Sequence, residues 1–89
     1  MDASQIQEHM EVVGSDGQHV GTVDKVEGQR IKLTRKDPAA QGQHHYLELS
    51  QASGVEGGKL RLSMAAAEAM ASWGSDARGV EPGSSRSGP

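Results

Sequence analysis

Four histidines stand out among the residues of this 89-residue chain that could do chemistry: His9, His19, His44 and His45. Neutral imidazole is a common ligand of zinc, copper and nickel, so the histidines raise the hypothesis of loose metal binding. His44 and His45 are adjacent, however, and neighbouring side chains of a strand point to opposite faces. No H-x-x-x-H or carboxylate spacing supports the others, and the chain has no cysteine. We therefore favour surface or structural histidines and expect no metal site and no cofactor.

Basic residues form the second candidate site. Four of them occupy alternate positions of two predicted strands: Arg30, Lys32, Lys59 and Arg61. If the two strands lie side by side, these side chains form a basic face that could hold RNA, anionic lipid or an acidic protein. The ordinary charged exterior of a sheet shows the same alternation, and Tyr46 is the one aromatic residue on which a base could stack. Tyr46 and His44 share the outward face of another predicted strand and form a further candidate contact point.

Groupings typical of catalysis are missing from the sequence. No glycine-rich phosphate loop leads from a strand into a helix, and no serine is spaced with a histidine and an acid as in a nucleophilic triad. Asp24, Glu27 and Glu48 could in principle act as acid and base, but no pattern marks a pocket around them. We therefore predict that the protein is not an enzyme.

The elements that must position these residues are predicted to be short strands. Asp16-Gly17, Gly28-Gln29 and Gly57-Gly58 suit tight hairpin turns. They separate apolar runs at about 11–14, 18–27, 30–34, 43–49 and 59–62, with a further short run around Val55. Five or six short strands at this spacing predict a mainly β fold, either a barrel or a sandwich.

The second run, at 18–27, contains an irregularity. Val20 and Val26 share one parity, whereas Val23 has the other. A regular strand cannot place all three valines inside, so we predict a bulge between Gly21 and Lys25. Such a bend lets one strand serve two sheets of a small barrel.

Helical patterns flank the strands. Ser4 and Gln7 fit a capping box before a short N-terminal helix. Ser63 is predicted to cap an alanine-rich helix over 64–73, which Gly74 ends. Its apolar stripe, with Met70 and Trp73, is interpreted as docking on the core rather than as an exposed anchor for a partner. The domain is therefore placed at residues 1–73, and 74–89 has the composition of a flexible, disordered tail.

Composition sets the remaining bounds. The formal net charge is −3 and 34% of residues are hydrophobic, so the core is thin and a partner or a second copy could add burial. The first residues lack the pattern of a secretory signal. No apolar run approaches the roughly 20 residues that span a bilayer. We expect a cytoplasmic protein without membrane insertion, and edge strands leave a homo-oligomer open.

Several motifs carry a resemblance. V-G-T-V at 20–23 after an Asp-Gly turn, Y-L-E-L at 46–49 and G-G-K-L-R-L at 57–62 resemble the PRC-barrel superfamily. That superfamily includes the cytoplasmic domain of the photosynthetic reaction-centre H subunit. More closely, the stretch 6–28, the G-Q-H-H-Y strand and the alanine-rich helix ending in Trp resemble a bacterial family of small stand-alone proteins of unknown function. The likeness covers roughly residues 4–73 and implies a small PRC-barrel-like β-barrel of five to six antiparallel strands.

The sequence thus predicts a binding or adaptor module that recognises another macromolecule, and we favour a protein as that partner. The partner-binding residues we expect are His44, Tyr46, Arg30, Lys32, Lys59 and Arg61. Nucleic-acid association through the four basic residues is the first alternative, and loose metal binding by the histidines is the second.

Overall fold

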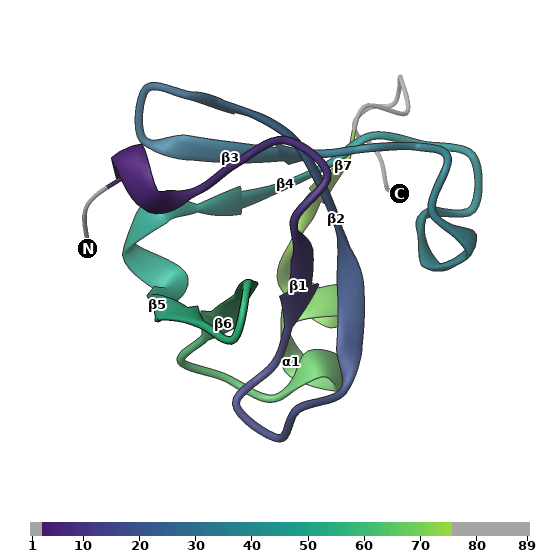
Figure 1. Cartoon of the computed structure of the whole chain (residues 1–89). Helices are drawn as coiled ribbons and strands as arrows, with labels where there is room; N and C mark the ends of the chain where they lie inside the picture. The colour runs from purple at the N-terminus through teal and green to yellow at the C-terminus, as the bar shows by residue number, and fades with distance from the viewer. Residues whose placement is uncertain (1–2, 76–89) are drawn as a thin grey trace.

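The computed structural model describes residues 3–75 and is mainly β with one helix near the C-terminal end (Figure 1). Its strands are β1 (Glu11–Val13), β2 (His19–Glu27), β3 (Arg30–Leu33), β4 (His45–Glu48), β5 (Ala52–Glu56), β6 (Lys59–Leu62) and β7 (Gly74–Ser75). The α-helix is α1 (Ala66–Ser72), and three short 3-10 turns are η1 (Ala3–Gln5), η2 (Pro38–Ala40) and η3 (Leu49–Gln51). The predicted mainly β class with one helix near the C-terminal end is confirmed.

The strands form one sheet in the order β5-β6-β1-β2-β3-β4-β7. β2 is the longest strand, and it pairs with β1 through its first half and with β3 through its second half. The register shifts between Val23 and Lys25, which confirms the predicted bulge. Because β2 bends there, the two halves of the sheet can turn their apolar faces toward one core.

That core is built from aliphatic side chains of both halves. Val12, Val20, Val23, Ile31, Leu33, Leu47, Leu60 and Leu62 are at most 1% exposed. In β3 the alternation predicted from sequence is confirmed, since Ile31 and Leu33 are buried and Arg30 and Lys32 are not. With no phenylalanine available, branched aliphatic residues fill the space between the two halves.

The predicted hairpin turns are confirmed at their glycines. Gly57 and Gly58 have φ of 57° and 77°, as the two central residues of a type I′ turn require. Gly28 has φ of 60°, which fits the first central position of a type II′ turn. These turns set the registers of β5 with β6 and of β2 with β3.

Two details of strand pairing differ from the prediction. β1 and β6 pair in parallel, whereas all neighbours were expected to be antiparallel. In addition, no pairing among residues 3–75 closes the sheet into a barrel, because β5 and β7 lie at its two ends. The reason is that the outer edge of β4, which would have to meet β5, is taken by β7 through Tyr46 and Gly74.

The residues that pair as β7 were expected to begin the flexible tail. Gly74 and Ser75 instead extend the sheet beside β4, so the ordered domain runs at least two residues beyond the predicted boundary at 73. The rest of the predicted tail, 76–89, lies outside the described residues.

Helix α1 is shorter than predicted and is capped differently. Its first buried turn lies on the β1–β2 hairpin, where Asp16 Oδ1 accepts a hydrogen bond from Ala66 N at 3.3 Å. Ser63, the predicted cap, donates its hydroxyl to the Gln51 carbonyl instead. Trp73 and Met70 pack against the core, which confirms that this stripe docks. None of the helices within residues 3–75 is long and apolar enough to cross a membrane.

The N-terminal segment departs from the predicted helix. A 3-10 turn at Ala3–Gln5 replaces it. The chain then runs beside β2, where His9 N donates to Val23 O at 2.8 Å and Val23 N donates to Met10 O at 2.9 Å. His9 has φ of 69°, a left-handed conformation that is uncommon for residues other than glycine. Ile6 and Met10 of this segment pack against the core. The apolar spacing that suggested a helix therefore reflects side chains buried by a segment that is not helical.

Candidate functional site

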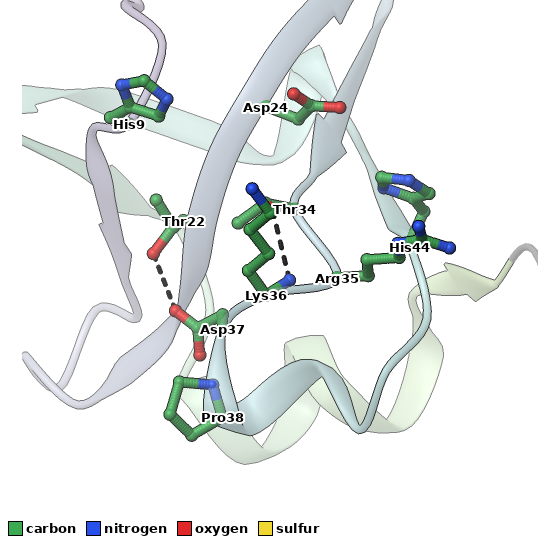
Figure 2. A pocket seen from close by; sticks show the side chains of 9 residues that line it. All are labelled: His9, Thr22, Asp24, Thr34, Arg35, Lys36, Asp37, Pro38 and His44. Atoms are coloured by element: carbon green, nitrogen blue, oxygen red, sulfur yellow. Dashed lines mark hydrogen bonds between the residues drawn. The ribbon is translucent and has the colours of Figure 1, made fainter.

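A cavity of about 490 Å³ lies at the end of the sheet where β3 leads toward η2. Figure 1 shows this β3–β4 connection projecting from one side of the sheet. Figure 2 shows the nine lining residues: His9, Thr22, Asp24, Thr34, Arg35, Lys36, Asp37, Pro38 and His44. They come from the N-terminal segment, β2 and the β3–β4 connection. Eight of the nine lining residues carry an ionisable or hydroxyl side chain, so the cavity offers polar groups to a ligand.

The β3–β4 connection is held in place by short hydrogen bonds. Thr34 N donates to the Thr22 carbonyl at 2.8 Å, and Lys36 N donates to Thr34 Oγ1 at 3.2 Å. Asp37 then caps η2, since its Oδ1 accepts from Ala39 N at 2.8 Å, and Pro38 occupies the first position of the turn. An aspartate cap followed by proline is a favoured way to begin a helical turn. The start of the connection is therefore hydrogen-bonded to β2, and the turn η2 in its middle is capped by the side chain of Asp37.

An ion-pair network joins this connection to the other half of the sheet. His19 Nδ1 lies 2.9 Å from Glu11 Oε2, and His19 Nε2 lies 2.7 Å from Asp37 Oδ2. Thr22 Oγ1 donates to the same Asp37 oxygen at 2.7 Å (Figure 2). Ionised carboxylates only accept hydrogen bonds, so both contacts are hydrogen bonds at once when His19 is protonated and both of its ring nitrogens donate.

The pKa values of the network follow from this geometry. Partial burial lowers the pKa of His19, but the hydrogen bonds and negative charges of Glu11 and Asp37 outweigh it and raise the pKa above its ordinary 6.5. Burial raises the pKa of Asp37, yet bonds from Thr22, Ala39 and His19 bring it below 3.8. The hydrogen bond from His19 lowers the pKa of Glu11 below 4.5, with Lys59 adding to the effect. The negative charge of Asp37 is thus compensated inside the protein.

Other lining side chains have no such partners. Those of His9, Asp24, Arg35 and Lys36 make no hydrogen bond or ion pair with another of residues 3–75. His44 Nδ1 donates to the Leu33 carbonyl at 2.9 Å, so at neutral charge its Nε2 is left as an acceptor. These groups keep their hydrogen-bonding capacity for a ligand.

The structure brings together four of the six residues predicted to bind a partner. All four have outward side chains: Arg30 and Lys32 on β3, Tyr46 on β4, and His44 just before β4. We call these four residues the β3–β4 face. Lys32 is the cross-strand neighbour of Tyr46, and the Arg30 guanidinium lies 4.5 Å from the centre of the Tyr46 ring. His44 belongs to this face and also lines the cavity, so the two features adjoin.

Lys59 and Arg61 do not join them. They lie on β6, and β1 and β2 separate β6 from β3. The side-by-side arrangement on which a single basic face depended is therefore not formed, and the four residues do not share one face. Lys59 Nζ lies 3.4 Å from Glu11 Oε1. Arg61 Nη2 donates to the Ser15 carbonyl at 2.6 Å, and its Nη1 lies 3.6 Å from Glu56. The β6 cations are occupied within the fold.

The histidines are dispersed. His45 is buried, as its parity predicted; its Nε2 donates to the Ala40 carbonyl at 2.9 Å, and its ring stacks on Trp73 at 3.9 Å between centroids. His44 faces the other side of the sheet. Within the described part of the chain, no group of three or more His, Cys, Asp or Glu could hold a metal ion.

Sequence reasoning missed most of the cavity. Arg35 and Lys36 were not among the predicted site residues, and His9 and His19 entered only as candidate metal ligands. The signal that could have marked the site is Asp37-Pro38, an aspartate cap with proline directly after it. It predicts a structured turn where composition suggests only a loop.

Residues 6–70 match the model of a family described as "Uncharacterized protein conserved in bacteria (DUF2171)". The chain belongs to this family. The DUF2171 match spans all strands except β7 and includes every residue of the cavity and of the β3–β4 face. It bears out the resemblance to a bacterial family of unknown function. Neither curated proteins nor solved structures gave a match to the chain.

Proposed function

We propose that this DUF2171 protein is a non-enzymatic binding module that recognises an acidic segment of a partner protein through the β3–β4 face. The observation that carries the proposal is the pairing of an Arg30–Tyr46 stack with a half-exposed Lys32 that makes no ion pair within residues 3–75. Arginine and tyrosine are enriched at protein interfaces, where they supply contact area and hydrogen bonds together.

The charge of the face favours an acidic partner. Lys32 has Lys25 as its cross-strand neighbour on β2, so a second lysine lies beside it, and the Lys25 ammonium is paired with Glu27 Oε2 at 3.2 Å. Arg30 is only loosely paired, at 3.8 Å from Glu27 Oε1, and its side chain is 53% exposed. Carboxylates of a partner would complement these cations and speed association.

The test is capture of partners from nuclease-treated bacterial lysate by three versions of the full chain, followed by affinity measurement on the purified partner. The disabling variant is Lys32→Gln with Tyr46→Ala; the matched control is Lys59→Gln with Arg61→Gln, which removes charge from β6. We expect the disabling variant to bind the partner at least about tenfold more weakly, because an aromatic anchor and a charge are lost. The control should bind like the unaltered protein. Equal loss in both variants would contradict the proposal.

Nucleic acid is the weaker candidate. The four basic residues required for it are divided between β3 and β6, which β1 and β2 separate. Recovery that disappears after nuclease treatment would support this alternative over a protein partner. Membership of the wider PRC-barrel superfamily and a cytoplasmic location also stay proposals, which rest on the sequence motifs and composition described above.

A further inference from the structure

We propose that the cavity between β2 and the β3–β4 connection is a binding site for a small oxyanion, a phosphate or carboxylate group held by Arg35 and Lys36. The cavity adjoins the β3–β4 face and shares His44 with it, but the proposal does not depend on a protein partner. Its volume of about 490 Å³ falls within the range of small-molecule pockets.

The charge balance of the lining carries the first step. Arg35 and Lys36 bring two cations, and Asp24 and Asp37 bring two carboxylates. Asp37 is already compensated by His19, Thr22 and the Ala39 amide, and its side chain is 4% exposed. The charges left for a ligand are therefore two cations against the single carboxylate of Asp24. An anionic group is the ligand that this balance favours.

The geometry of the donors is the second step. Arg35 and Lys36 are consecutive and exposed, and the backbone that carries them is anchored through Thr34 to β2. The hydroxyl oxygen of Thr34 accepts the Lys36 amide, so its own proton is available to a ligand. The Arg35 guanidinium, the Lys36 ammonium and the Thr34 hydroxyl all belong to residues of the cavity lining, and they are the donors that phosphate and carboxylate oxygens accept.

His9 supplies an independent observation. Its φ of 69° is unfavourable for a residue with a Cβ, and backbone outliers of this kind persist where surrounding structure holds them. Here the hydrogen bonds of His9 N and Met10 O to Val23 hold the segment. The side chain of His9 lies on the cavity wall opposite the β3–β4 connection (Figure 2), so the strained conformation places an imidazole at the site.

The experiment is an NMR titration of the full chain with sodium phosphate, and separately with sodium acetate, against sodium chloride at matched ionic strength and constant pH. We expect saturable shifts of the Thr34, Arg35, Lys36 and His44 amides, with those of Lys59 and Arg61 unmoved. Saturation by phosphate alone would define a phosphate site, and saturation by both anions a general oxyanion site. Shifts that do not saturate, or that chloride reproduces, would overturn the proposal.

Variants separate a local site from the overall charge. Arg35→Gln should raise the Kd for phosphate about tenfold, since one charge-assisted contact is lost. Lys59→Gln removes the same charge from β6 and should leave the Kd unchanged. Asp24→Asn should lower the Kd about threefold by removing the opposing carboxylate. Equal effects of Arg35→Gln and Lys59→Gln would show only a response to net charge and would also overturn the proposal.

Discussion

The two halves of the sheet differ in how their basic side chains are paired. In the half formed by β5, β6 and β1, the basic side chains contact neighbours within the fold. In the half formed by β3, β4 and their connection, several basic side chains project without partners among residues 3–75. Lys59 pairs with Glu11 and Arg61 with the Ser15 carbonyl and Glu56. Lys32, Arg35 and Lys36 have no ion pair with any residue from 3 to 75. Both halves show the same sequence pattern of basic residues at outward strand positions. Only the β3–β4 half keeps cations that are available to a ligand.

This difference in ion pairing comes from the side chains that lie opposite each basic residue on the neighbouring strands. Glu11 of β1 lies directly beside Lys59 of β6 in the parallel pair, so an acid and a base meet across the strands. On the other half, Lys32 meets Lys25 on one side and Tyr46 on the other. Alternation places a side chain outward, but its cross-strand neighbours determine whether it serves stability or recognition.

His19 joins the two halves. It bonds Glu11 from β1 and Asp37 from the β3–β4 connection, so the cavity wall is tied to the half of the sheet whose charges are internally paired. The predictions below test this division, beginning with the tie itself.

Replacing Asp37 should have the largest effect. In Asp37→Ala, the Ala39 amide loses its cap, and Thr22 and His19 lose a buried charged acceptor. We expect the free energy of unfolding to fall by about 3 kcal/mol, from the sum of a lost cap and lost charge-assisted hydrogen bonds. Urea denaturation measures it. Asp24→Ala is the control from the same cavity and should change stability by less than about 0.5 kcal/mol.

Stability should also depend on pH through His19. Its pKa is raised in the folded protein, so its stabilising contribution is complete below about 6.5 and is lost as pH rises through the folded value. Glu11 and Asp37 have lowered pKa values, so their contributions are lost as pH falls below about 4 through their folded values. The network should therefore stabilise the fold most between about pH 5 and 6.5.

Comparing the protein with His19→Gln isolates this contribution. The difference in unfolding free energy should reach about 1 kcal/mol in that window, kept small because the His19 side chain is 40% exposed and water screens its pairs. It should shrink toward zero by pH 9. A difference that stays constant from pH 5 to 9 would show that a neutral imidazole holds the two carboxylates equally well.

Local patterns predicted much of the fold. The period of two in β3 placed Ile31 and Leu33 inside, and the conflict of parity around Val23 located the bulge. Those features depend on residues close in sequence. The parallel pairing of β1 with β6 does not, since it brings together residues almost fifty positions apart. That pairing is what separated the two basic strands.

The cavity was less accessible to sequence reasoning for the same reason. Its wall combines the N-terminal segment, β2 and the β3–β4 connection, and His9 reaches it through a backbone conformation that sequence patterns normally assign to glycine. The β3–β4 face was half predicted, because His44 and Tyr46 share a parity on one strand. Its alignment with Arg30 and Lys32 required the register of β3 with β4.

The smallest expected effect compares one arginine from each half. Arg61→Gln should lower the free energy of unfolding by about 1 kcal/mol, because its guanidinium donates at 2.6 Å to a backbone carbonyl of the β1–β2 hairpin. Arg35→Gln should change it by less than about 0.3 kcal/mol, since no hydrogen bond or ion pair with another described residue is lost. Urea denaturation of both variants at pH 6 and 0.15 M salt makes the comparison direct. If Arg35→Gln destabilised the fold as much as Arg61→Gln, Arg35 would have a structural role, and the division between bound and available cations would fail at the residue on which the oxyanion site depends most.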